Sequence, residues 1–184
     1  MYYNRMILKK PITLIGLMGS GKTTIGSYLA KKLDVDFVDS DREIELQAGY
    51  SVSEIFQRDG ESFFRKVEAK TIQSQLLSGK ICVLATGGGA FMNEETREII
   101  KNHSIVVWLK ADLDVLIERL EQNDSRPLLQ NTNKREKLQN LIDIRYPIYA
   151  EAHIVVDTNV NSRTIVSNEI ISKIEEFQSE QTNS

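Results

Sequence analysis

The sequence predicts a single α/β domain, a three-layer α/β/α sandwich around a central parallel sheet of about five strands. Short apolar runs alternate with helical patterns along the 184 residues, which is typical of parallel strands joined by helical crossovers. The apolar runs are continuous, as expected for strands that are buried on both faces. A composition of 41% apolar and 27% charged residues is that of an ordinary globular domain.

The expected strands are the apolar runs at residues 12–17, 35–39, 81–85, 104–109 and 154–157. After the first of them, Ile25, Leu29 and Leu33 recur at i, i+4 and i+8, which lines one face of a helix. The further helical patterns lie at 42–49, 52–77, 94–102 and 112–121, and a last helix follows the fifth strand and fades into the polar tail at 178–184. In sheets of this kind, ligands bind at the carboxyl ends of the strands.

Charge and cysteine content argue against several functional classes. A net charge of -3 and a pI near 5.5 do not favour a nucleic-acid partner. The single cysteine, Cys82, can build neither a disulfide framework nor a Cys/His zinc site, which fits a reducing cytosol. Lys9 and Lys10 precede an apolar run as in a signal peptide, but the run lacks a cleavage site and is too short to span a bilayer. We expect a cytoplasmic protein without a membrane partner and, as the simplest state, a monomer.

Residues 16–23, Gly-Leu-Met-Gly-Ser-Gly-Lys-Thr, match the P-loop pattern G-x-x-x-x-G-K-[ST] at every fixed position. Glycines let successive backbone N–H groups turn toward phosphate oxygens, and the helix that follows presents its positive end. Lys22 is expected to reach the β- and γ-phosphates, and the Thr23 hydroxyl to bind Mg²⁺. The motif predicts a nucleoside triphosphate with magnesium, bound by Gly19, Ser20, Gly21, Lys22, Thr23 and Thr24.

A P-loop alone does not define an activity. The sequence has no D-x-x-G motif, and its nearest approach to the N-K-x-D of GTPases, at residues 133–136, ends in glutamate. A large mechanical ATPase would need a longer chain. These observations leave a small-molecule kinase or a nucleotide kinase, in which a second substrate lies beside the γ-phosphate.

Acidic residues follow the second expected strand at its carboxyl end, where Asp39 and Asp41 flank Ser40. One acid could orient Mg²⁺ while the other accepts hydrogen bonds from an acceptor hydroxyl. Asp or Ser at this point is equally suited to cap the helix that follows. The pattern alone does not separate these two interpretations.

Three consecutive glycines follow the third strand, in the segment Thr-Gly-Gly-Gly-Ala at residues 86–90. They permit a tight turn whose N–H groups can approach a ligand, whereas an ordinary loop would account for one or two glycines. Arg65 and Arg145 are each typical of surface ion pairs. If the two converged, their guanidinium groups would suit a carboxylate.

The segment at 122–136 is polar, and its one proline follows Arg126. A long polar loop in a compact domain is usually functional or disordered.

These motifs together resemble those of the shikimate kinases. The resemblance covers about residues 10–160 and rests on GLMGSGKTT, DSD, GESFFRKVE, ATGGGA, SRPLL and RYPIY, in that order. It implies a fold like that of nucleoside-monophosphate kinases and the transfer of the γ-phosphate of MgATP to the 3-hydroxyl of shikimate. It also implies one kinase domain over 1–184, with a substrate-binding segment at about 41–78 and a mobile lid at about 122–134.

On the acceptor side, the resemblance assigns the shikimate ring hydroxyls, and the role of base, to Asp41. It implies that Arg65 and Arg145 clamp the carboxylate of shikimate, and that Gly88 and Gly89 offer backbone donors to it.

On the nucleotide side, the resemblance assigns the magnesium-side acid to Asp39, together with the P-loop threonine. Arg126 is similar to a lid arginine that moves onto the phosphates, and Arg119 to a residue that packs along the adenine. Phe56 and Phe64 are expected to form an apolar wall of the substrate pocket. Lys22, Asp41 and Arg126 are thus the expected catalytic residues.

Residues 158–163 allow no assignment of an adenine contact. The alternatives to a shikimate kinase are another small-molecule P-loop kinase, such as a gluconate or nucleotide kinase, and a nucleotide-binding regulator without an acceptor. Neither alternative explains why the acid, the two arginines and the triple glycine occur together.

Overall fold

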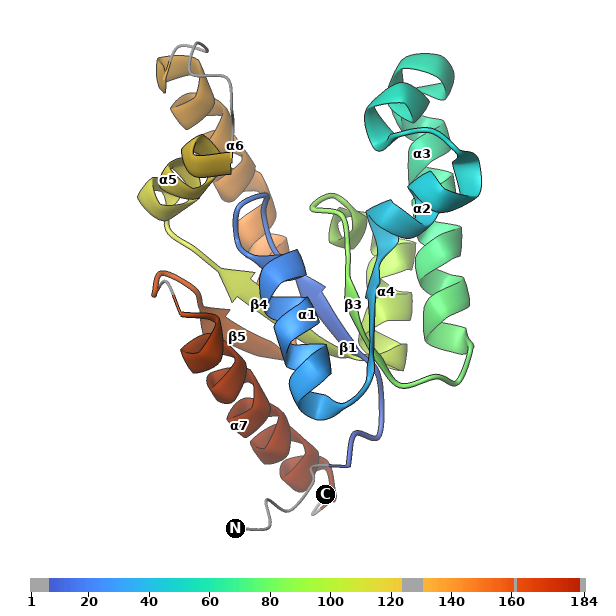
Figure 1. The fold of residues 1–184 in the computed structure, drawn as a ribbon, viewed down its shortest axis with the longest axis vertical. Coiled ribbons are helices and arrows are strands. Elements are labelled where there is room, and N and C mark those ends of the chain that lie inside the picture. The colour runs from blue at the N-terminus through green and yellow to red at the C-terminus, as the bar shows by residue number, and fades with distance from the viewer. Residues whose placement is uncertain (1–6, 124–130, 161, 183–184) are drawn as a thin grey trace.

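The structure is a computed structural model and describes residues 7–123, 131–160 and 162–182. In this part of the chain, five parallel strands form one sheet in the order β2-β3-β1-β4-β5, which confirms the predicted fold class (Figure 1). The strands are β1 (Ile12–Ile15), β2 (Asp36–Asp39), β3 (Cys82–Ala85), β4 (Ile105–Lys110) and β5 (Ile154–Asp157).

Both faces of the sheet are covered (Figure 1). The helices α1 (Lys22–Leu33) and α7 (Arg163–Thr182) pack on one face. The core on the other face receives side chains from α3 (Val52–Leu77), η1 (Ala90–Met92), α4 (Glu94–His103), α5 (Leu113–Asn123) and α6 (Asn131–Tyr149). Successive strand residues point to opposite faces, so Leu14 joins the first core and Ile15 the second. This is why the strands are continuous apolar runs in the sequence.

Local sequence signals mark both ends of helix α2 (Ser40–Ala48) and the start of α3. The side chain of Asp39 accepts hydrogen bonds at the start of α2, and Gly49 ends that helix with a φ of 72°. Ser51 and Glu54 form a capping box at the start of α3. The expected helix over 52–77 is confirmed, with a break at Gly60, whose φ of 82° and ψ of 167° are not helical.

Helix α6 was not expected, and it begins at Asn131, inside the segment that reads as a polar loop. Its apolar side chains, which include Leu138, Leu141, Ile142, Tyr146 and Tyr149, belong to the core under the sheet. Polar residues separate them near the start of the helix, and Pro147 lies inside it, so the sequence shows no clear helical period. None of the described helices is long and apolar enough to cross a membrane.

His153 links the start of β4 to helix α7. Its Nδ1 accepts a hydrogen bond from the Val106 N–H at 3.0 Å, and its ring stacks on Phe177 with 5.1 Å between the ring centroids. Burial lowers the pKa of His153, and the charges of Lys10 and Lys101 lower it further. The neutral ring is therefore part of the folded structure, which agrees with a structural role for this histidine.

We expect the free energy of unfolding to decrease as the pH falls from about 6.5, the ordinary pKa of histidine, through the lower pKa of folded His153. Above this window the ring is neutral in both the folded and the unfolded state. Below it, a proton on Nδ1 breaks the bond from Val106. Denaturant unfolding at a series of pH values measures the effect.

The chain has two histidines, which provides a matched control. His153→Gln should lose this part of the pH dependence, whereas His103→Gln, at the exposed end of α4, should keep it. Equal pH dependence in the two variants would contradict the assignment.

Candidate active site

The loop between β1 and α1 has the backbone conformation of a phosphate cradle. Gly16, Gly19 and Gly21 have φ values of 153°, 82° and 94°, which residues with side chains rarely adopt. A Cβ atom on Gly16 would also lie 2.6 Å from Ser20 Oγ and 2.8 Å from Leu109 O. Gly21 is the N-cap of α1 and provides no side-chain bond, so N–H groups of the first turn are left for a ligand.

Lys22 lies along this loop. Its Nζ donates hydrogen bonds to Gly16 O at 2.8 Å and to Leu17 O at 3.0 Å. Burial of the amine lowers the pKa of Lys22 to about 8, against the charges of Asp41 and Asp39, which raise it. A phosphate would replace two neutral acceptors by a charged one, which makes a stronger hydrogen bond.

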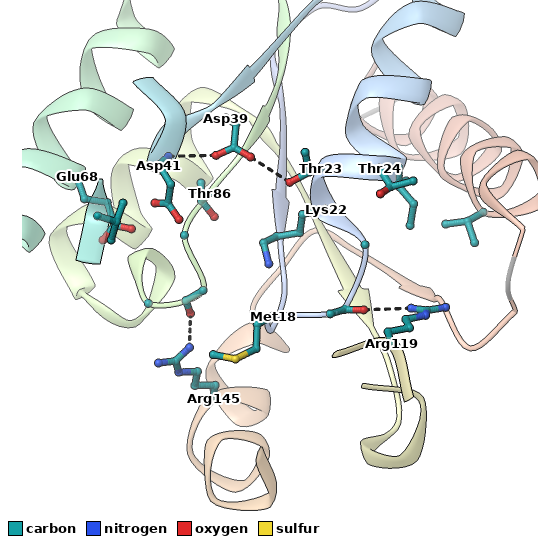
Figure 2. A pocket seen from close by; sticks show the side chains of 18 of the residues that line it. Met18, Lys22, Thr23, Thr24, Asp39, Asp41, Glu68, Thr86, Arg119 and Arg145 are labelled. Carbon is teal, nitrogen blue, oxygen red and sulfur yellow. Dashed lines mark hydrogen bonds between the residues drawn. The ribbon is translucent and has the colours of Figure 1, made fainter. Parts of the chain in front are cut away.

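Asp39 both caps α2 and faces the P-loop (Figure 2). Its Oδ1 accepts from the N–H groups of Asp41 and Arg42 at 3.1 and 3.4 Å, and its Oδ2 accepts from Thr23 Oγ1 at 3.0 Å. This carboxylate and hydroxyl are hard oxygen donors, which suit Mg²⁺. Among the described residues there is no group of three His, Cys, Asp or Glu side chains that could hold a metal ion. A magnesium ion here would therefore also need phosphate oxygens and water.

Two carboxylates, Asp41 and Glu68, converge beside Gly87. A Cβ atom on Gly87 would clash with Glu68 Oε1 and lie 2.9 Å from Asp41 Oδ1. Within the described ranges, neither of these two buried oxygens has a hydrogen-bond partner. Burial raises the pKa of both carboxyl groups. Two buried carboxylate oxygens thus lie against the first glycine of the turn.

Glu68 is a site residue that the motifs did not identify. It is only 1% exposed, and its Oε2 accepts a hydrogen bond from Arg65 Nη1 at 2.7 Å. The signal that could have found it is its position three residues after Arg65, which places both on one side of α3. The structure therefore adds an acid that orients one of the expected clamp arginines.

The two arginines lie at the next two glycines of the turn. A Cβ atom on Gly89 would lie 2.5 Å from Arg65 Nη2, and one on Gly88 would lie 3.1 Å from Arg145 Nη1. Arg145 Nη1 also donates to Gly88 O at 2.9 Å (Figure 2). A different charged group therefore lies close to each of the three glycines. The two arginines thus lie at neighbouring glycines of one turn, so the expected carboxylate clamp stays a prediction.

Phe56 and Phe64 line the same side of the cleft as Arg65. Their ring centroids are 4.7 Å apart, and the Arg65 guanidinium lies 5.9 and 5.3 Å from them. These cation–π contacts restrict the arginine and place an apolar surface beside it.

Arg119, on α5, lies at the opposite end of the cleft. It donates to Gly19 O at 3.4 Å and to Thr158 O, and so joins the P-loop to the segment after β5. Val160, Ser162 and Arg163 line the cleft as well. The segment for which the sequence allowed no adenine assignment therefore borders the site.

One cleft of about 810 Å³ contains these groups at the carboxyl ends of β1, β2 and β3. Figure 2 shows Lys22 between Asp41 on one side and Arg119 on the other. Arg126 lies outside the described residues, as does most of the expected lid at 122–134. Their roles stay predictions.

Comparison with known proteins identifies the family of this chain. A family model described as shikimate kinase matches residues 18–175. A shikimate kinase of Cereibacter sphaeroides is 50% identical over 82% of this chain and 75% of its own length, and one of Rhizobium meliloti is 42% identical over 95% and 90%.

Solved structures give the same result. The shikimate kinase of Acinetobacter baumannii in complex with shikimate has a TM-score of 0.83 and 39% identity, over 91% of this chain and 93% of that one. A gluconokinase of Sinorhizobium meliloti has a TM-score of 0.61 and 14% identity over 94% and 95%, which shows a shared fold alone. The family model and the relatives, at 42–50% identity over most of the chain, show that the protein belongs to the shikimate kinase family.

Proposed function

We propose that the protein transfers the γ-phosphate of ATP to the 3-hydroxyl of shikimate, giving ADP and shikimate 3-phosphate. The observation that carries this conclusion is the convergence of Arg65, Arg145 and two carboxylates on one glycine turn beside a P-loop. Membership of the shikimate kinase family, at up to 50% identity, favours shikimate over gluconate or a nucleotide as the acceptor.

On the acceptor side, Arg65 and Arg145 bind the carboxylate of shikimate, and the N–H groups of Gly88 and Gly89 support it. The carboxylate of Asp41, which lines the cleft, accepts a hydrogen bond from the attacking hydroxyl and takes its proton as the phosphoryl group is transferred. Burial and the negative charge of Asp39 raise the pKa of Asp41, which strengthens it as a base, while the positive charges of Lys22 and Arg65 oppose the shift.

On the donor side, Lys22 and the N–H groups of Gly19, Gly21 and Thr24 hold the phosphates. Ser20, which the motif also predicted to bind, is buried, and its N–H donates to Leu17 O at 3.1 Å within the loop. Their positive charge and dipoles stabilise the negative charge that spreads over the transferred group. Thr23 and Asp39 would hold Mg²⁺, which supplies further charge neutralisation at the phosphate oxygens. Arg119 packs along the nucleotide base.

We propose that the active state is a monomer, as expected from the sequence. We further propose that the segment at about 122–134, with Arg126, closes over the phosphates. Closure would exclude water, whose attack would hydrolyse ATP without product. A cytoplasmic location stays a prediction of the sequence.

Lys22→Ala should lower kcat by about 10²–10³-fold, as for the loss of one preorganised donor to the transition state. The measurement is ADP release in a coupled assay with MgATP and shikimate. Lys32→Ala, at the exposed end of the same helix, is the matched control and should retain wild-type turnover. Wild-type turnover in Lys22→Ala would contradict the P-loop assignment.

Arg145→Ala should raise the KM for shikimate about tenfold or more, with a much smaller change for ATP, because it removes a charge-assisted bond to the carboxylate. Steady-state kinetics with each substrate varied in turn measure both constants. Arg135→Ala removes an exposed arginine from the same helix, where it pairs with Asp114, and should leave both unchanged. Equal changes in both KM values would point to a structural arginine.

Asp39→Asn should raise the Mg²⁺ concentration needed for half-maximal activity, because it removes one negative charge from the magnesium side of the site. Asparagine is also a good N-cap, so α2 should keep its start. Asp36→Asn, at the exposed start of β2, is the control. An Mg²⁺ concentration for half-maximal activity that equals the wild-type value would remove Asp39 from the metal site.

A further inference from the structure

The carbonyl oxygen of Gly88 is held by two side chains of α6. Arg145 Nη1 donates to it at 2.9 Å, and the Tyr149 hydroxyl donates to it as well. Residues four apart lie on the same side of a helix, so both reach one acceptor. A carbonyl oxygen has two lone pairs, and these two donors use both.

The two donor side chains differ in how freely they can move. Tyr149 is fully buried, and its ring packs on Phe91 and Trp108 with centroid distances of 6.4 and 5.9 Å. Burial raises the pKa of Tyr149, so its hydroxyl stays protonated and keeps donating. Arg145 is partly exposed and lines the cleft. The tyrosine is therefore a fixed support, whereas the arginine can turn toward a ligand.

The peptide between Gly88 and Gly89 connects the supported carbonyl group to an N–H group of the cleft. The C=O of Gly88 and the N–H of Gly89 belong to one planar trans peptide and point in opposite directions, so a bond that fixes one also orients the other. In the described part of the chain, neither Gly88 N–H nor Gly89 N–H has a protein acceptor, and both glycines line the cleft. Tyr149 thereby orients a donor group that it does not contact.

The other end of the turn is held too. Gly87 N–H donates to Ser40 Oγ at 3.2 Å, and Ser40 is fully buried. Ser40, which lies between Asp39 and Asp41 in the sequence, thus fixes the first glycine of the turn. Asp39 caps the helix that begins at Ser40.

We propose that Tyr149 is a positioning residue for the acceptor: it holds the Gly88–Gly89 peptide so that Gly89 N–H and Arg145 are both available to the carboxylate of shikimate. The inference rests on the proposed function. When Arg145 turns to the substrate, Tyr149 still satisfies Gly88 O. Without the hydroxyl, Gly88 O is left with Arg145 alone, and the substrate must compete for that guanidinium.

The test compares Tyr149→Phe with Tyr146→Phe. Tyr146 lies one turn earlier on α6, also packs on Trp108, and donates its hydroxyl to Ala111 O, a carbonyl outside the glycine turn. Each variant loses one hydroxyl and one hydrogen bond to a backbone carbonyl. Melting temperature and circular dichroism establish that both are folded.

Tyr149→Phe should raise the KM for shikimate about tenfold, equivalent to about 1.4 kcal/mol, and leave the KM for ATP near the wild-type value. Tyr146→Phe should change neither, even if both lower the melting temperature equally. Equal shikimate KM values in the two variants would overturn the inference. A wild-type protein without shikimate-dependent ADP release would overturn the proposed function itself, and this inference with it.

A double-mutant cycle tests whether Tyr149 acts through the turn. In an Arg145→Ala background, the effect of Tyr149→Phe on the shikimate KM should shrink, because the competition for the guanidinium is gone. Purely additive effects would count against the inference.

If Tyr149→Phe does not fold, Ser40→Ala frees the other end of the turn and should also raise the shikimate KM selectively. An unchanged shikimate KM in a folded Ser40→Ala would overturn the idea that the turn must be held.

Discussion

The active site depends on the parallel pairing of β2, β3 and β1. Asp39 pairs with Ala85, and Ala85 with Leu14, so the three strands end at one edge of the sheet. Thr86 reinforces this register, since its N–H and Oγ1 both donate to Leu14 O, at 3.2 and 3.3 Å. The P-loop, the first turn of α2 and the glycine turn therefore start side by side. A shift of one residue would turn every side chain of a strand to the other face and separate these groups.

In each half of the cleft, a cationic side chain donates hydrogen bonds to neutral carbonyl oxygens. Lys22 donates to Gly16 O and Leu17 O, and Arg145 donates to Gly88 O. Binding of a phosphate or a carboxylate would exchange these acceptors for charged ones, which form stronger hydrogen bonds. Arg65 differs, because it already pairs with Glu68 at 2.7 Å. The proposed clamp would thus combine one arginine that pairs with an acid and one that is bonded to a neutral carbonyl oxygen, next to the buried tyrosine that holds the same carbonyl.

The sequence could predict the features that depend on neighbouring residues. The apolar runs predicted the five strands, and the glycines and helix start of the P-loop predicted its conformation, because each is encoded within a few residues. The resemblance to the shikimate kinases placed Asp41, Arg65 and Arg145 in one site, and the structure brings them to the same glycine turn. Their roles in binding and catalysis await the kinetic tests.

Other features were decided by the tertiary structure, because they depend on contacts between residues far apart in the chain. Asp39 is capping residue and P-loop partner at once, since its two oxygens face different elements. Glu68 belongs to the site because packing of α3 buries it. Tyr149 belongs to it because packing of α6 brings its hydroxyl to Gly88, at a sequence separation of 61 residues. The start of α6 at Asn131 likewise follows from burial against the sheet. Local sequence patterns do not predict contacts between residues far apart in the chain. The P-loop could be predicted because its residues are neighbours in the sequence.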